Sequence, residues 1–193
     1  MTSFRDLLAV DSIDMGAIAA HLDTLDHQAR VNELRSVPGS LQANLFRAAR
    51  GYRQLTLEDF VPQSTPDRQF VRHLGKNSLP VFSHFEKRFA RPASGSPVLW
   101  GFNHGPVMGL VGPGHFVMRT GPDDGELHVD YYSIPEEQLD GAPALQTNTV
   151  GISRFVYGWM IDVLRGVSTH VTIGRAVKHG KDTPNYFLLT REP

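Results

Sequence analysis

Two side chains in the stretch GELHVDYYSIP, residues 125–135, have the types and spacing of metal ligands. His128 and Asp130 are separated by one residue, and residues two apart on a β-strand project to the same face. With a distant second histidine, His170 or His179, they would form the two-histidine, one-carboxylate site that holds iron in oxygenases. One hypothesis is therefore a small non-haem iron enzyme that uses His128, Asp130 and His170.

The opposite face of the same segment is more apolar. Leu127 and Val129 alternate with the histidine and the aspartate, and Tyr131 continues the apolar set. Because the side-chain period of a strand is two, the register that buries this set fixes the direction of every neighbour. We therefore expect Tyr131 and Ser133 to face the core or a pocket, and the His–Asp pair to face water.

Other reactive side chains lack the surroundings that their chemistry requires. His104 and His115 lie beside Gly-Pro or Pro-Gly steps, which are typical of turns. The chain has no cysteine and no H-E-x-x-H segment, so the usual zinc sites are not supported. The serines of PGSLQ and GISRF lack the second glycine of G-x-S-x-G. We therefore expect a binding role rather than a catalytic one.

Length and composition indicate one globular domain. A domain typically has about 150 residues, and no linker divides these 193. The absence of cysteine fits a reducing cytoplasm, and the N-terminus MTSFRDLLAVDSIDMG has the features of neither a signal peptide nor a membrane span. A formal net charge of -1 argues against a nucleic-acid-binding protein, for which a basic domain is expected.

Residues 1–92 are predicted to be the helical part of this domain. Ile18 and Leu22 recur at helical spacing. Further on, PVFSHFEKRF, residues 80–89, has an apolar helical face from which His84 points away.

Residues 97–193 are predicted to form a sheet and one helix. Short segments rich in β-branched and aromatic residues alternate with turn residues, which is typical of an antiparallel meander. An apolar stripe from Ile152 to Val167 predicts a long helix. HVTIGRAVK and NYFLLTR then predict two closing strands. The expected class is α+β, with N-terminal helices followed by an antiparallel sheet and one long helix before the last two strands.

The order of three segments resembles a known superfamily. GELHVDYYSIPEEQL, GISRFVYGWMIDVLRGV and HVTIGRAVKHGKDTPNYFLLT are similar to the 4-vinyl-reductase small-molecule-sensor domain, the haem-nitric-oxide/oxygen-binding domain and the Bet3-like trafficking subunits. The likeness covers about residues 97–190, and it extends to a paralogous group of small myxobacterial proteins of unknown role. It implies that an apolar small molecule is enclosed between helices and sheet.

The haem-binding relatives also suggest a cofactor. Their Tyr-x-Ser-x-Arg clamp for a haem propionate is matched by Tyr131 and Ser133, but Pro135 stands where the arginine would be. His84 is the candidate for the proximal haem ligand. The cysteines that vinyl-reductase-type domains carry near their last two strands are absent.

Our leading hypothesis is a cytoplasmic, homodimeric ligand-binding or sensory domain with an apolar cavity. The aromatic character of the expected core motivates it, since ligand pockets are lined mainly by apolar and aromatic side chains. The candidate ligand-binding residues are Trp100, Tyr131, Ser133, Phe155, Trp159 and His84.

The main alternative is a protein–protein interaction module without a ligand, similar to the Bet3-like dimers. It would use the basic segment 84–91, with Lys87 and Arg88, against an acidic partner. In either case we expect no nucleic acid as a partner and no membrane span.

Overall fold

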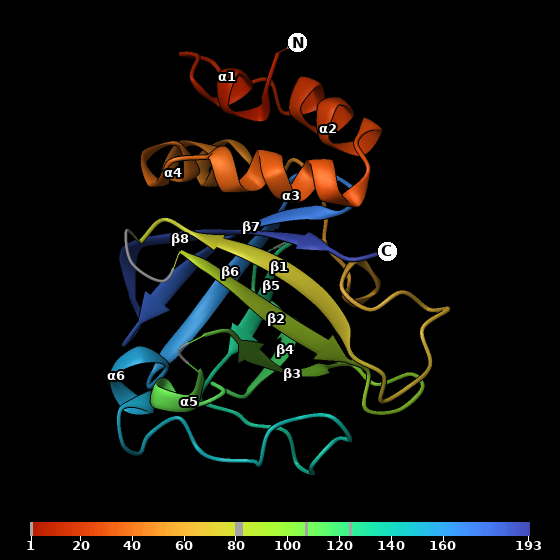
Figure 1. Ribbon diagram of the computed structural model, residues 1–193, viewed down its shortest axis with the longest axis vertical. Helices are drawn as coiled ribbons and strands as arrows, with labels where there is room; N and C mark the ends of the chain where they lie inside the picture. Colours follow the sequence, from red (N-terminus) through yellow and green to blue (C-terminus); the bar gives the residue numbers. More distant parts are fainter. Residues whose placement is uncertain (1, 80–82, 107, 124) are drawn as a thin grey trace.

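The computed structural model describes residues 2–79, 83–106, 108–123 and 125–193, and its central feature is a closed β-barrel (Figure 1). Eight antiparallel strands follow one another around the barrel in chain order, and β8 pairs with β1 to close it. The strands are β1 (Val71–Asn77), β2 (His84–Ala90), β3 (Leu99–His104), β4 (Phe116–Thr120), β5 (Leu127–Asp130), β6 (Met160–Gly166), β7 (Val171–Lys178) and β8 (Lys181–Arg191).

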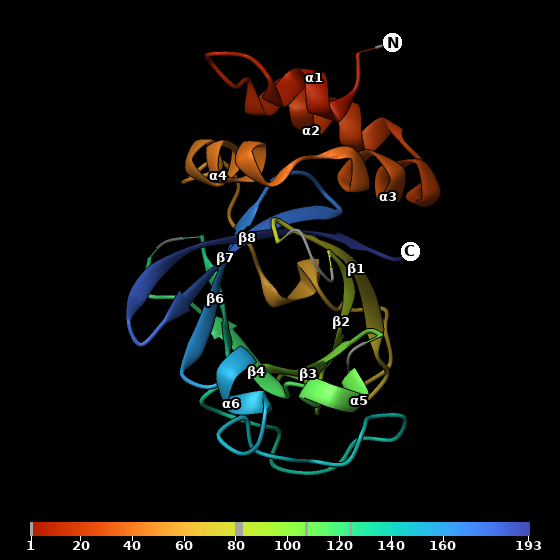
Figure 2. The same ribbon diagram turned by 60° about the vertical axis from the view of Figure 1, so that its left-hand side comes forward.

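Among the described residues, four α-helices precede the barrel and cover one side of it (Figures 1 and 2). They are α1 (Phe4–Leu8), α2 (Met15–Thr24), α3 (His27–Ser36) and α4 (Gly39–Ala48). Asp14 and Asp26 cap α2 and α3 by accepting hydrogen bonds from backbone N–H groups of the first turn. α3 and α4 contact β8, and they also reach β1 and β7 respectively.

The other described helices are single turns, η1 (Leu57–Asp59), α5 (Met108–Val111) and α6 (Ser153–Val156). Among the described residues, no helix combines the length and the apolar character needed to cross a membrane.

An outer core joins the helices to the barrel wall. Its buried residues include Phe4, Ile18, Leu22, Leu45 and Phe46 from the helices and Val163, Val171, Ile173 and Leu188 from β6, β7 and β8. The helices therefore bury the outward face of these three strands.

An inner core fills one end of the barrel. Phe60, which follows η1, stacks on His73 with ring centroids 5.1 Å apart and meets the edge of Phe89. Met118, Val129, Leu164 and Leu189 pack in the same cluster. Figure 2 shows the segment that carries η1 within the outline of the barrel. Eight-stranded barrels either fill their interior with side chains or hold one small ligand, and this one is filled at one end.

The α+β class expected from the sequence is wrong, because the sheet closes into a barrel. The expected helical part, 1–92, includes β1 and β2. Pro80, Val81 and Phe82 of the expected helix lie outside the described residues, and the segment from His84 onward belongs to β2.

The long helix expected from Ile152 to Val167 is also wrong, since only Ser153–Val156 is helical and Met160–Gly166 is β6. β6 is buried on both faces, with Val163 in the outer core and Leu164 in the inner core. A strand buried on both faces has a continuous apolar sequence, which periodicity alone does not distinguish from a buried helix. The two closing strands are present as β7 and β8.

The prediction for 80–89 failed for a different reason. Phe85, Lys87 and Phe89 alternate along β2, and Lys87 is 2 % exposed. The apolar alternation that indicates a strand is interrupted at Lys87. Because lysine is rarely fully buried, the sequence offered no reason to assign it to the inward face.

Candidate functional site

The unfilled end of the barrel contains a cavity of about 380 Å³. Apolar side chains form most of its wall, among them Phe85, Val111, Tyr157, Met160, Ala176 and Phe187. Ligand pockets are typically about 300–1,000 Å³ in volume and mostly apolar, with a few polar groups. The cavity has the size and lining of such a pocket.

Four polar side chains from different parts of the barrel meet in the cavity wall. Lys87 Nζ lies 2.9 Å from Asn103 Oδ1 and 3.0 Å from Asp162 Oδ2, and it also donates a hydrogen bond to the Tyr131 hydroxyl. Asn103 Nδ2 donates to the same hydroxyl at 3.0 Å and to the carbonyl oxygen of Gly114 at 3.0 Å. The Tyr131 hydroxyl lies 3.2 Å from Asp162 Oδ2. We call Lys87, Asn103, Tyr131 and Asp162 the polar cluster.

Strand pairing explains why these residues meet. Lys87 and Asn103 are directly paired across β2 and β3, so their side chains share the inward face. Asp162 pairs with Val129, an inward residue of β5. Closure of the barrel then brings β2 and β6 to opposite sides of one interior, where the lysine and the aspartate meet.

Tyr131 follows β5 and is held on several sides. Its N–H donates to the carbonyl oxygen of Met160 at 3.1 Å, and its own carbonyl accepts from Asn148 Nδ2 at 3.0 Å. Its ring stacks on Tyr157 with centroids 5.4 Å apart and meets the edge of Phe116 at 5.5 Å. These contacts fix the direction of the hydroxyl.

Aromatic rings surround the ammonium group of the cluster. Lys87 Nζ lies 5.0 Å from the ring centroid of Tyr131, 5.1 Å from Phe116 and 5.2 Å from Phe187. A cation over an aromatic face is attracted by the ring quadrupole. Phe187 reaches this position because Gly174 faces it: a Cβ at Gly174 would lie 2.2 Å from the ring.

Burial governs the ionisation of the polar cluster. It lowers the pKa of Lys87 and raises the pKa of Asp162, while the attraction between the two groups opposes both shifts. Burial, reinforced by the charge of Asp162, raises the pKa of Tyr131 well above its ordinary value and that of Tyr157 to about 12. Both phenols therefore stay protonated at neutral pH.

Several apolar side chains lie at the mouth of the cavity. Leu79, Leu110 and Val156 line the cavity and are also exposed to solvent, Leu110 by 67 %. α5 and α6 lie side by side in both views of the barrel (Figures 1 and 2). An apolar molecule would therefore meet apolar side chains from the surface to the cavity wall.

Two of the residues proposed from the sequence line the cavity. Tyr131 belongs to the polar cluster, and His84 lies at the exposed rim. Ser133 is elsewhere: its Oγ donates to Asp130 Oδ2 at 2.9 Å and accepts from Arg119 Nη2 at 3.1 Å. β5 ends at Asp130, so the alternation that placed Ser133 beside Tyr131 does not extend that far.

Phe155 and Trp159 do not line the cavity either. Phe155 is 72 % exposed on α6, and Trp159 stacks on His179 with centroids 5.1 Å apart. Their neighbours Val156, Tyr157 and Met160 line it instead. The expected helix would have placed Phe155, Val156, Trp159 and Met160 on one stripe, and its absence changes which of them face inward.

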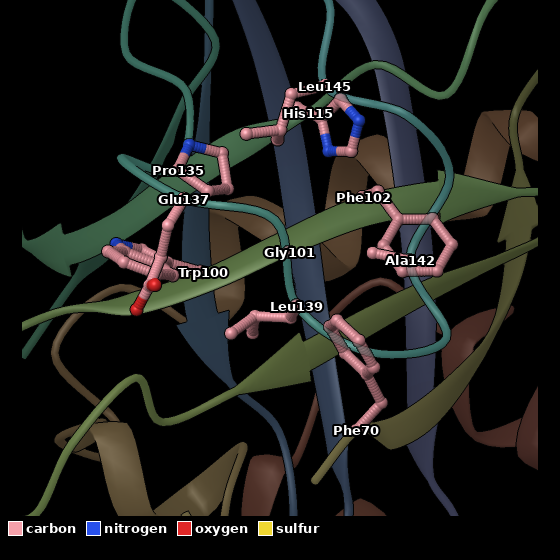
Figure 3. Close-up of a pocket in the computed structure, with 10 residues that line it drawn as sticks. All are labelled: Phe70, Trp100, Gly101, Phe102, His115, Pro135, Glu137, Leu139, Ala142 and Leu145. Atoms are coloured by element: carbon pink, nitrogen blue, oxygen red, sulfur yellow. The ribbon is translucent and has the colours of Figure 1, made fainter. Parts of the chain in front are cut away.

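Trp100 lies on the outer face of β3, where it packs with Ala90, Val117 and Leu139. Figure 3 shows it beside β3 and beneath the loop that carries Pro135 and Leu145. The crevice there measures only about 10 Å³, room for one water molecule at most. Trp100 therefore joins the loop to the barrel and does not contact the cavity.

The iron hypothesis lacks a ligand cluster. The described part of the chain contains no group of three His, Asp or Glu side chains placed to hold a metal ion. Asp130 pairs with Arg119 at 3.1 Å, and His170 Nδ1 contacts Arg191 Nη2 at 3.2 Å.

The basic segment 84–91 does not expose both of the cations expected on a docking surface. Lys87 is inside the barrel, and Arg88 Nη2 pairs with Glu86 Oε2 at 3.0 Å.

Sequence reasoning missed Lys87, Asn103 and Asp162 as members of a site. A usable signal was present, because Lys87 lies between Phe85 and Phe89 at spacings of two, and Asp162 lies between Met160 and Leu164 in the same way. Had both segments been interpreted as strands, two opposite charges would have been predicted on inward faces.

No protein-family model, curated protein or solved structure matches this chain. The resemblance to the 4-vinyl-reductase superfamily therefore stays a prediction.

Proposed function

We propose that this protein binds one small, largely apolar molecule inside the unfilled end of its barrel. The observation that carries the proposal is the division of the interior: one end is packed with side chains, and the other holds about 380 Å³ of space between apolar walls and the polar cluster. A cavity of this size is not a packing defect, because voids larger than a water molecule are rare in protein interiors.

The two parts of the cavity have different roles in this proposal. The apolar wall contributes affinity through burial of the ligand, at about 25 cal/mol per Å² of apolar surface removed from water. The polar cluster, which is rigidly hydrogen-bonded, orients the one polar group that such a ligand carries. Affinity and orientation thus come from different residues and are separable by mutation.

Titration with N-phenylnaphthylamine, a neutral dye that fluoresces in apolar surroundings, tests the proposal. Wild-type protein should give a saturable increase in fluorescence at one dye per chain. Ala176→Phe, which adds a ring to the wall, should weaken binding roughly tenfold or more, because about 1.4 kcal/mol of lost contact is a factor of ten. The matched control is Ala93→Phe, the same change at an exposed position in the loop after β2.

Circular dichroism should show that both variants remain folded. Unchanged dye affinity in a folded Ala176→Phe variant would overturn the proposal, as would weakening by the same factor in Ala93→Phe.

A further inference from the structure

The hydrogen bonds of the polar cluster restrict the kind of ligand that the cavity accepts. A lysine ammonium group has three donor hydrogens and no acceptor. Nζ of Lys87 has three polar neighbours in the cluster: Asn103 Oδ1 at 2.9 Å, Asp162 Oδ2 at 3.0 Å and the Tyr131 hydroxyl. The three donors of the lysine are therefore all engaged with protein atoms.

The amide and the phenol have no donor left for a ligand. The amide group of Asn103 has two hydrogens, which go to the Gly114 carbonyl and the Tyr131 hydroxyl, both at 3.0 Å. Tyr131 has a single O–H, which is within reach of Asp162 Oδ2 at 3.2 Å and of Asn103 Oδ1 at 3.3 Å. Every donor of the polar cluster is thus used within the protein.

One acceptor remains. A carboxylate accepts about four hydrogen bonds through its two oxygens, and the contacts of Asp162 with Lys87 and Tyr131 are both made through Oδ2. No described residue donates a hydrogen bond to Oδ1 of Asp162, and this oxygen is not among the unpartnered side-chain atoms that are sealed from solvent. Asp162 lines the cavity. The polar cluster therefore presents an acceptor, and no donor, to the cavity.

We propose that the ligand is an apolar alcohol, whose hydroxyl group donates a hydrogen bond to Oδ1 of Asp162. The inference rests on the proposed function and specifies the polar end of the ligand. A ketone, an aldehyde or an ether has no donor hydrogen for Oδ1 of Asp162. A ligand carboxylate would add a second negative charge beside Asp162. An alkylammonium ligand would add a second positive charge beside Lys87, because Lys87 Nζ lies only 3.0 Å from the Asp162 carboxylate.

A ligand hydroxyl group would also replace the water that Oδ1 of Asp162 loses when a ligand binds. An acceptor covered by an apolar ligand loses its water without replacement, which is costly for a charged group. Sites that hydrogen-bond a substrate hydroxyl accordingly reject analogues that lack it. We expect an alcohol to bind at least roughly tenfold more tightly than an ether of the same shape.

The test compares ligands of one chain length in competition with N-phenylnaphthylamine on wild-type protein. Decanol, decyl methyl ether, decanal, decanoate and decylammonium share an apolar body and differ in the polar end. Decanol should displace the dye at the lowest concentration. Equal or tighter binding of the ether, the aldehyde, the carboxylate or the ammonium ion would overturn the inference.

A variant adds a second criterion. Asp162→Asn should remove the advantage of decanol over the ether, because an amide replaces the charged acceptor that the hydroxyl group contacts. Retention of the full preference by the folded variant would overturn the inference. Failure of wild-type protein to bind the dye or any of the five ligands would instead overturn the proposed function, so the two outcomes are distinguishable.

Discussion

Lys87 Nζ lies 3.0 Å from Asp162 Oδ2 inside the barrel, and both residues are 2 % exposed. Each group is costly to bury alone, so each depends on the other and on the hydrogen bonds of Asn103 and Tyr131. A buried ion pair contributes little net stability compared with an apolar pair of similar volume, but removal of one partner is expensive. A substitution that removes one partner of this pair should therefore lower the stability of the protein as well as change the cavity wall.

Removal of one charge should show this dependence. Lys87→Met should lower the free energy of unfolding by about 3–5 kcal/mol, because Asp162 is left as an unpaired buried carboxylate. The double variant Lys87→Met/Asp162→Leu should recover most of that loss, since no unpaired charge remains. Urea denaturation of the wild type, both single variants and the double variant gives the coupling energy. If the double variant lost as much free energy of unfolding as the two single variants together, this account of the pair would be contradicted.

His73 should make stability depend on pH. Burial between Phe60 and Phe89 lowers its pKa to about 3, although its Nε2 donates a hydrogen bond to the Phe60 carbonyl at 3.0 Å. Its ordinary pKa is 6.5, so below pH 6.5 the unfolded chain takes up a proton that the folded protein does not.

The free energy of unfolding should accordingly fall with falling pH, by about 1.4 kcal/mol per pH unit from this residue, until pH reaches about 3. Chemical denaturation at a series of pH values measures the slope. His73→Phe serves as the control, because it keeps a ring and removes the titrating group. An identical slope in wild type and variant would refute the prediction.

Gly174 should be sensitive to the addition of a single methyl group. A Cβ there would lie 2.2 Å from the Phe187 ring, so Gly174→Ala should displace that ring and cost about 1–3 kcal/mol of stability. Gly109→Ala is a suitable control, since a Cβ at Gly109 meets no atom within 4 Å. Thermal denaturation compares the two, and similar melting temperatures would argue against the close contact of Gly174 with the ring.

Trp100 should matter for stability and not for binding. It is 7 % exposed on the outer face of β3, so Trp100→Ala should cost about 3–5 kcal/mol. The affinity for N-phenylnaphthylamine should stay unchanged at temperatures where the variant is folded. Loss of binding without loss of stability would place Trp100 in the site and contradict its position in the structure.

The inward direction of Leu127, Val129 and Tyr131 was predictable, because the alternation of a half-buried strand is a local property. The meeting of Lys87 with Asp162 was not. It depends on closure of the barrel between strands far apart in the chain, and no local pattern encodes that closure.

The expected positions of Phe155 and Trp159 depended on a helix that is not formed, because the outer core buries the second face of β6. The sequence therefore predicted a cavity with aromatic side chains in its wall, but of the six proposed ligand-binding residues only Tyr131 and His84 line it.

The most direct measurement is a nuclear Overhauser experiment on protein with isotope-labelled methionine methyl groups and bound N-phenylnaphthylamine. Met160 lines the cavity, whereas Met15 is buried in the outer core beneath the helices. The proposed function predicts cross-peaks between the dye protons and the Met160 methyl group, and none to Met15. Cross-peaks to Met15 without any to Met160 would show that the dye binds between the helices and the barrel wall, and would contradict a ligand site inside the barrel.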